Sequence, residues 1–391
     1  MMHFFFIANR FLNSNKGTGK LTGVVSTIGI TIGCFALVIS VSVLNGFKSQ
    51  VNDKIKDFEG EIKVSGHGLS DDVSIFDGFD KIKIVSPYRE RTGIAIKGSK
   101  QKVVTFKEIN TKTFKQFFNL PIIGGYPNNE QILVGYDIAS GLGVKVGDEI
   151  IVSSPLDQKM ILGFSPSKKL QVSGLFHSKI LDFDNNFIFI PKNIGEKLFL
   201  NKSKVNSFDI KIKNRANVLE LKKDLIQLLG EDNRIETWKD RHSTLVKAMN
   251  MEKLGSVIVL SLIILVASFN MMATLSLITI KKIKDIGIIR ILGSTIYDTQ
   301  KVLFAQAIII GGRGIFFGMF IGLSFVLLQN LFGFIKLPND IYAMDILPME
   351  ITIIDMLMII SISLALIIIP GWFSARKVSK LKPIKAIRWV K

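Results

Sequence analysis

Residues Lys281–Thr299 read KKIKDIGIIRILGSTIYDT and lie between two long apolar runs, Leu254–Ile280 and Val302–Leu328. Each run can cross a bilayer, because a membrane-spanning helix needs about 20 apolar residues. The stretch predicts a short amphipathic helix with Ile286 on its apolar face, ended by Gly293, since glycine accepts the left-handed conformation that stops helices. A short basic helix tied to two membrane spans can transmit force from a soluble partner. A solvated basic loop is the alternative interpretation.

The composition is that of a membrane protein. Hydrophobic residues make up 48% of the 391 residues and the mean hydropathy is +0.37, which is too apolar for an ordinary soluble enzyme. The net charge of +18 is unevenly distributed, because residues 1–21, 281–301 and 371–391 hold 15 Lys or Arg against two Asp, whereas residues 329–350 hold one Lys against three acids. This is the positive-inside pattern, so we interpret the basic surplus as a topology signal and expect no nucleic-acid partner.

Hydropathy and charge together predict an α-helical integral membrane protein with four transmembrane helices and a large α/β domain inserted between helices 1 and 2. The predicted boundaries are an interfacial N-terminal segment 1–21, transmembrane helices 22–44, 254–280, 302–328 and 351–370, the inserted domain 45–253 with a possible division into two lobes, a coupling region 281–301, an outer loop 329–350 and a basic tail 371–391. The first apolar run is longer than the core of a signal peptide, so we expect it to be retained. Both termini are then cytoplasmic.

The third predicted span carries Gly314, Gly318 and Gly322 at four-residue intervals. Small residues on one helix face allow close backbone contact, which drives helix association in lipid. Glycine is also common in membrane helices generally, and this is the alternative explanation. Arg313 in the same span should reach towards the interface or find a partner, because a charge at that depth is costly. Asp355, near the outer end of its span, is expected to reach the interface.

No catalytic or metal-binding pattern is present in the sequence. Gly17-Thr18-Gly19-Lys20 resembles part of a phosphate-binding loop, but Ser14 and Leu21 stand where that pattern requires glycine and Ser/Thr. The four histidines lack the spacing of metal ligands, and the single cysteine excludes a disulfide framework. We therefore predict no catalysis, no metal site and no cofactor bound by this chain.

Several motifs recur in an order that points to a known family. They are SVLNGF at the end of the first span, LVGYDIASGLGVKVGDEIIVSSP and VSGLFHSKILDFDNNFIFIP in the inserted domain, TWKDRHSTLVKAMNMEK before the second span, FNMMATLSLITIKKIKDIGIIRILGST at the coupling region, and PGWFSARKVSKLKPIKAIR at the C-terminus. In this arrangement the chain resembles the permease subunits of lipoprotein-releasing ABC transporters (LolC/LolE type), within the wider FtsX/MacB-type permeases. One departure is Lys281, which stands where the family usually has a glutamate.

The resemblance implies a bacterial inner-membrane location, a periplasmic inserted domain with a MacB-like core, and pairing with a second permease copy or paralogue. It also implies a separate ABC ATPase subunit that holds the ATP and Mg, a lipoprotein cargo and a periplasmic lipoprotein carrier. The residues that we assign to ATPase coupling are Asp285, Ile286, Ile289, Arg290 and Gly293.

The cargo has acyl tails in the outer leaflet and a body in the periplasm, so its site should be apolar on one side and wet on the other. Asn45, Gly46 and Phe47 at the outer end of the first span, with the adaptable side chains of Met271 and Met272, are the candidates for this site. An ordinary interfacial anchor is the alternative for these residues.

The loop Ile161–Lys169, with Phe164 and Pro166, falls where the family can carry a hook for the carrier protein. The predicted function is extraction of lipoproteins by mechanical transmission of ATPase closure. The alternatives are export of another amphiphile or a peptide, and a membrane-anchored regulator of a periplasmic enzyme. An apolar groove open to the outer leaflet would favour the extruder.

Overall fold

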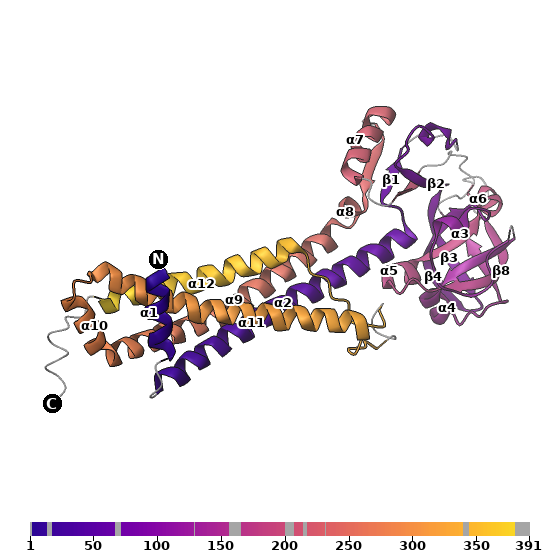
Figure 1. The fold of residues 1–391 in the computed structure, drawn as a ribbon. Coiled ribbons are helices and arrows are strands. Elements are labelled where there is room, and N and C mark those ends of the chain that lie inside the picture. Colours follow the sequence, from indigo (N-terminus) through magenta and orange to yellow (C-terminus); the bar gives the residue numbers. More distant parts are fainter. Residues whose placement is uncertain are drawn as a thin grey trace. The chain divides into compact units, whose positions relative to one another are not determined.

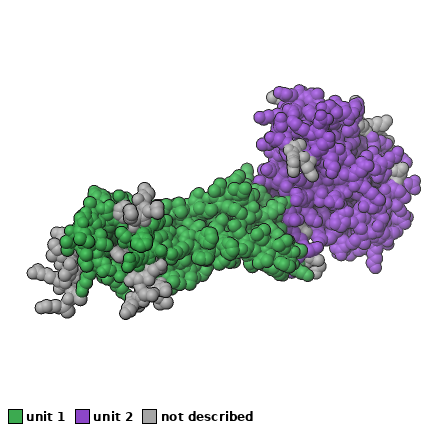
Figure 2. Space-filling model, viewed as in Figure 1, with its two compact units in different colours: residues 1–49, 247–337, 346–391 green, residues 50–246, 338–345 purple. Residues whose placement is uncertain are grey.

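The structure is a computed structural model of the full chain. It describes residues 2–13, 18–66, 72–128, 130–155, 166–199, 207–213, 217–230, 232–338 and 344–379. The chain divides into two compact units, coloured separately in Figure 2. Unit 1 comprises residues 1–49, 247–337 and 346–391, and unit 2 comprises residues 50–246 and 338–345.

Unit 1 is built from helices. They are α1 (Met2–Asn13), α2 (Thr18–Phe58), α9 (Ser243–Lys281), α10 (Ile283–Ile291), α11 (Ile296–Phe332) and α12 (Ile353–Ser379), labelled in Figure 1. Within the described residues, α2, α9, α11 and α12 are long and apolar enough to cross a membrane. The prediction of four spans is therefore confirmed.

The helices are longer than the spans that hydropathy outlines. The first helix continues past residue 44 to Phe58, and the second begins at Ser243 rather than 254. The fourth passes through Pro370 and ends at Ser379, beyond the predicted boundary at 370. Hydropathy detects only the apolar part of a helix, whereas the helix itself continues as long as its backbone hydrogen bonds continue. The observed helices therefore extend beyond the predicted spans. Proline is tolerated inside membrane helices because neighbouring groups satisfy the backbone that it frees.

The helix α11 contacts α2 through its glycine face, formed by Gly314, Gly318 and Gly322. A Cβ added at these three positions would lie 2.7 Å from Ile30, 2.6 Å from Cys34 and 2.8 Å from Val38, all on α2. On another side, a Cβ at Gly311 would lie 2.4 Å from Ile367 of α12. The glycines thus let α11 pack closely between two neighbours of the same chain.

Unit 2 is an α/β domain with two sheets. A four-stranded antiparallel sheet has the order β11-β1-β10-β2, from strands Arg234–Thr237, Ile62–Ser65, Ser207–Ile212 and Ile82–Tyr88. Helix α7 (Val218–Leu229) packs on it through Leu221 and Leu225. The short elements η1 (Ser74–Phe76) and α8 (Trp238–Arg241) also belong to this part of the unit.

The second sheet has seven strands in the order β5-β8-β6-β9-β4-β3-β7, and β7 also pairs with β8. The strands are β3 (Glu90–Lys97), β4 (Lys100–Ile109), β5 (Ile122–Gly124), β6 (Gln131–Gly135), β7 (Glu149–Ser153), β8 (Ser167–Phe176) and β9 (Phe187–Pro191). The pairing of β7 with β8 closes six of them into a ring around an apolar core. Short helices α3 (Phe114–Phe117), α4 (Tyr136–Leu142), α5 (Leu181–Asn186) and α6 (Lys192–Leu198) connect the strands.

An aromatic cluster in unit 2 receives the end of α2. Phe58, the last residue of α2, is 0% exposed, and its ring stacks on Phe183 with 4.0 Å between the ring centroids. Phe118, Phe189 and Trp238 belong to the same cluster. Burial of large aromatic side chains is a strong apolar contribution, so the end of this helix is firmly held in unit 2.

Replacing Gly318 with Leu should lower the thermal unfolding temperature of the detergent-solubilised chain, because the new side chain meets Cys34 and the carbonyl oxygen of Thr31 on α2. Overpacking of this kind typically costs about 1–3 kcal/mol. The matched control is Gly312→Leu on the same helix, since a Cβ at Gly312 meets no atom within 4 Å. Equal losses for the two variants would mean that the glycine face does not carry helix packing.

Candidate functional site

The coupling region consists of α10 and a sharply defined turn into α11. The residue Gly293 has φ +104°, and its N–H donates to the carbonyl oxygen of Arg290. Two residues later Thr295 begins α11 with a capping box, in which its hydroxyl and backbone N–H both donate to the Asp298 carboxylate. Only glycine adopts such a φ without strain. The turn therefore fixes the direction of α11 relative to α10.

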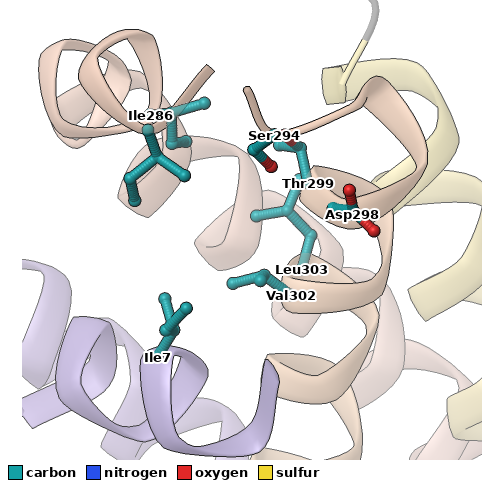
Figure 3. Close-up of a pocket in the computed structure, with 8 residues that line it drawn as sticks. Ile7, Ile286, Ser294, Asp298, Thr299, Val302 and Leu303 are labelled. Atoms are coloured by element: carbon teal, nitrogen blue, oxygen red, sulfur yellow. The ribbon is translucent and has the colours of Figure 1, made fainter. Parts of the chain in front are cut away.

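The apolar residues of α10 face both inwards and outwards. The Ile286 side chain is 9% exposed and lines a cavity of about 50 Å³ with Ile7 of α1 and with Val302 and Leu303 of α11, as Figure 3 shows. In contrast, Ile291 is 82% exposed. The sequence assigned Ile286 to ATPase coupling, which stays a prediction; in the structure its side chain faces α1 and α11.

The outward residues of the coupling region are not among the five residues that the sequence assigned to ATPase coupling. Ile288 and Leu292 are exposed together with Ile291, whereas Ile289 and Arg290 are half-buried. Asp285 pairs with Lys282 at 3.1 Å on the helix surface. The sequence does contain a signal for these residues, because apolar side chains occur on all sides of α10. Whichever side packs against the other helices, apolar side chains on the opposite side remain exposed.

The first helix, α1, lies against α11. Ala8 is fully buried in a cluster with Val302 and Ala305. The guanidinium of Arg313 donates a 3.1 Å hydrogen bond to the side-chain oxygen of Asn9. This is the partner that the sequence left unidentified. A neutral amide oxygen can also accept a hydrogen bond from a guanidinium, although it carries no charge that would mark it in the sequence.

At the other end of the bundle, three helices are joined by a polar clasp made of Asn45, Lys253 and Asp355. The ammonium of Lys253 lies 2.7 Å from the Asp355 carboxylate and donates to the Asn45 side-chain oxygen at 2.9 Å. The Asn45 amide donates to the same carboxylate at 2.8 Å. Asp355 is 6% exposed and paired inside unit 1, and its location at the membrane interface stays a prediction.

The candidates for cargo contact do not form one site. Asn45 belongs to the clasp, and a Cβ at Gly46 would lie 2.4 Å from the carbonyl oxygen of Pro348, so both residues serve contacts within the chain. Phe47 is 40% exposed, whereas Met271 is 0% exposed and lies in the helix core. These candidates therefore differ in their surroundings, and of the residues named here only Phe47 is exposed.

The last cargo candidate, Met272, lines an apolar groove of about 460 Å³ between α9 and α12. The groove is also lined by Leu265, Phe269, Leu366, Ile369, Pro370 and Phe373. Met272 follows Lys253 by 19 positions on α9, which is about 28 Å at the helical rise. Since Lys253 contacts Asn45, the groove and Phe47 lie near opposite ends of the bundle.

The predicted carrier loop is only partly described. Phe164 lies outside the described residues. Pro166 is half-buried, and its carbonyl oxygen accepts from the Ser154 N–H at 3.1 Å. The strand β8 begins at Ser167, so the last three residues of the predicted loop belong to the seven-stranded sheet.

A buried ion pair connects the two sheets of unit 2. The Lys107 ammonium on β4 lies 2.8 Å from the Asp209 carboxylate on β10, and the two side chains are 2% and 0% exposed. Tyr88 donates a 3.1 Å hydrogen bond to the same carboxylate, and Glu90 lies 3.5 Å from Lys107. Charges at this depth persist only when they are paired and hydrogen-bonded.

The same network reaches the segments that adjoin α2 and α9. The guanidinium of Arg241 lies 3.6 Å from Asp209 and 3.0 Å from Glu59, the residue after α2. His242, the residue before α9, contacts the Glu59 carboxylate at 3.2 Å. Burial opposes the charged form of Glu59, but the hydrogen bond with His242 and the charges of Arg241 and Lys107 outweigh it and lower its pKa to about 2.

Replacing Glu59 with Gln should reduce the free energy of unfolding at pH 7 by about 3 kcal/mol, because the pKa falls from 4.5 to about 2 on folding. Because the pKa of Glu59 is lower in the folded state than in the unfolded state, its carboxylate stabilises the folded state at pH values above the unfolded pKa. This stabilisation is lost as the pH falls from about 4.5 towards 2. The difference in stability between wild type and variant should therefore narrow over that range in denaturant titrations. The control Glu130→Gln removes an exposed carboxylate and should differ little from wild type at any pH.

Among the residues that the structure describes, no group of three or more His, Cys, Asp or Glu side chains is placed to hold a metal ion. Cys34, the single cysteine of the sequence, is buried in the helix core of unit 1. Within unit 2, the buried charges of Lys107 and Asp209 are paired and link its two sheets.

Comparison with known families agrees with this architecture. Residues 24–228 match the MacB-like periplasmic core domain, and residues 257–383 match the FtsX-like permease C-terminal domain. The resemblance that the motifs indicated is confirmed by these matches, and so is the α/β periplasmic domain between the first and second spans.

Individual relatives are distant but match along nearly their whole length. The chain is 24% identical to the lipoprotein-releasing system transmembrane protein LolC of Xylella fastidiosa and to the protein LolE of Haemophilus influenzae, with 98% of both chains covered in each case. Among solved structures, the periplasmic region of MacB from Actinobacillus actinomycetemcomitans is 14% identical, with a TM-score of 0.35 over 49% of this chain and 95% of that one.

Proposed function

Because the chain belongs to the ABC transporter permeases that join a MacB-like periplasmic core domain to an FtsX-like permease domain, we propose that it drives the release of lipoproteins from the membrane. The protein is a multi-pass membrane protein with a periplasmic domain. Its family lacks an ATPase domain of its own, so a partner ATPase supplies the energy. In the proposal, the termini and coupling region face the cytoplasm, the membrane is the bacterial inner membrane, and a periplasmic carrier accepts the cargo.

The observation that carries the mechanical part is the continuity of α2 and α9. Each is a single helix that begins or ends in unit 1 and has its other end in unit 2. The Glu59, Arg241 and His242 side chains tie those ends to each other and to the Lys107–Asp209 pair. In the proposal, a displacement of the unit 2 end of either helix moves both sheets, because separating a buried charge from its partner costs much free energy.

The surface for the partner ATPase is the outward side of the coupling region, Ile288, Ile291 and Leu292. These large apolar side chains are 58%, 82% and 81% exposed. Nearby cations include Lys281 and Lys284. An apolar groove edged by carboxylates is the complementary surface, with apolar anchors giving affinity and charge giving orientation. ATP and Mg belong to that partner.

Replacing Ile291 with Asp should weaken co-purification with the ATPase at least tenfold and abolish stimulation of ATP hydrolysis, because an apolar anchor becomes a carboxylate facing carboxylates. The helix bundle should stay folded, since the position is exposed. Leu219→Asp is the matched control, because Leu219 is 66% exposed but lies in the periplasmic unit. Undiminished ATPase binding by the Ile291 variant would contradict the assignment of this face.

The cargo assignment rests on chemistry at the outer end of α2. Phe47 is exposed beside the clasp and follows Gly46, whose backbone packs against the loop before α12. An aromatic ring at the boundary between lipid and water can contact both an acyl chain and the body of an acylated protein. The names of the relatives that match along nearly their whole length, which are transmembrane proteins of lipoprotein-releasing systems, support this choice of cargo. A second permease copy or paralogue would supply the facing surface.

A photocrosslinker in place of Phe47 should capture a lipoprotein in membranes that contain the partner ATPase, and the yield should fall when ATP is supplied and cargo is released. The control position is Phe316, which is 65% exposed on α11 at another level of the bundle. Capture of a different amphiphile at position 47 during ATP-driven turnover would favour the alternative substrate. Capture of nothing there, with turnover intact, would remove Phe47 from the cargo route.

A further inference from the structure

A pocket of about 170 Å³ lies between the start of α11 and the end of α12, at the far end of these helices from the clasp. Its lining residues are Tyr297, Gln300, Lys301 and Phe304 from α11 and Trp372, Ala375 and Arg376 from α12. The contacts of the proposed cargo and ATPase surfaces do not involve these side chains. The pocket combines two cations with three aromatic rings, which is an unusual lining for a solvated surface.

Two of the lining residues are cations. The Arg376 guanidinium lies over the Trp372 ring, 5.3 Å from its centroid. The Lys301 side chain is 61% exposed and lies 3.9 Å from Asp298. That acid is already engaged, because its carboxylate accepts two hydrogen bonds from Thr295 at the start of α11. The two cations outnumber this single acid, so the described charged side chains here sum to a positive charge.

An apolar cluster adjoins the pocket through Phe304 and Ala375. Leu303 and Ala375 are buried against each other, and Phe304 packs on them. The Trp372 and Tyr297 rings are 49% and 72% exposed. A ligand that fits this lining carries a negative charge on one end and a hydrocarbon portion on the other.

The position along the helices indicates the source of such a ligand. The apolar run of α12 ends near Pro370, so Trp372 and Arg376 lie where a bilayer gives way to water. Trp and Tyr favour that interface, and Lys and Arg beside it attract anionic lipid headgroups of the cytoplasmic leaflet. The coupling region next to the pocket is basic as well.

We propose that this pocket binds the phosphate headgroup of an anionic phospholipid, with Lys301 and Arg376 contacting the phosphate and the acyl chains lying along Trp372 and Phe304. The inference does not depend on the identity of the cargo. It places a lipid across the inner ends of α11 and α12, directly after the Gly293–Thr295 turn that sets the direction of α11. Bound lipid would thus hold the two helices together where the coupling region meets the membrane.

The test uses Trp372 as its own reporter. The full chain is reconstituted in phosphatidylcholine nanodiscs that contain a small fraction of phosphatidylglycerol or phosphatidylcholine with brominated acyl chains, which quench tryptophan. The signal of Trp372 is the difference between wild type and Trp372→Phe. Brominated phosphatidylglycerol should quench this signal at much lower fractions than brominated phosphatidylcholine. Equal quenching by the two lipids would overturn the proposal, and this result needs no substitution of Lys301 or Arg376.

The charge arm compares two double variants. Lys301→Gln/Arg376→Gln should reduce the preference for phosphatidylglycerol about 25-fold, because each cation near an anionic surface contributes about fivefold. Lys281→Gln/Lys284→Gln removes the same charge from the neighbouring segment, away from the pocket lining, and should keep most of the preference. If both double variants lose the preference for phosphatidylglycerol equally, general surface charge explains that preference, and the proposed site is overturned.

A competition arm separates the lipid from free phosphate. Inorganic phosphate at millimolar concentration should leave the quenching by brominated phosphatidylglycerol unchanged, because it lacks the hydrocarbon that contacts Phe304 and Trp372. Displacement of the lipid by inorganic phosphate would assign the pocket to a soluble anion and overturn the lipid assignment. ATPase binding and cargo capture are measured in separate experiments. A negative result for lipid binding therefore does not bear on the proposed transport function.

Discussion

The buried pair between Lys107 and Asp209 is the constraint on which the arrangement of unit 2 depends. One charge comes from the ring of strands and the other from the four-stranded sheet, and both are removed from water. Neither can be buried alone without a penalty of several kcal/mol, so the two sheets must be held in the register that brings the charges together. Arg241 and Glu59 complete the network, which is why the segments adjoining α2 and α9 are fixed at the same place.

Unit 1 is held differently at its two ends. At the clasp, Asn45, Lys253 and Asp355 join three helices through charged hydrogen bonds. At the coupling end, the described contacts of α10 with α1 and α11 are mainly apolar, through Ile286 and Ile7. Apolar contacts are non-directional, so helices can slide over one another at small cost, whereas a charge-assisted pair has one favourable geometry. A push on the coupling region is therefore expected to shift the apolar end while the clasp keeps the helices in register.

Hydropathy and charge predicted the four spans and the inserted domain because burial in lipid demands long apolar runs. They could not predict helix ends in water, and α2 and α9 extend well beyond their spans. Helix α7 has clear local boundary signals, since Asn217 caps its start and Gly230 follows its end. Strands β8 and β10 have weaker local signals, because lysines stand near the start of one and the buried Asp209 interrupts the apolar pattern of the other. A charge whose partner is distant in sequence has no local signature.

The lack of a local signature for contacts between distant residues also explains why the predicted cargo residues do not form one site. Sequence proximity suggested that Asn45, Gly46 and Phe47 act together, but a helix turns by about 100° per residue, so three consecutive side chains face three directions. Two of those directions meet neighbours within the chain, the clasp and the Pro348 backbone, and the third leaves Phe47 exposed. The apolar groove beside Met272 lies about 28 Å away along α9 and cannot extend this surface. In the proposed route, the second permease copy or paralogue would face Phe47 and supply the apolar wall opposite an acylated cargo.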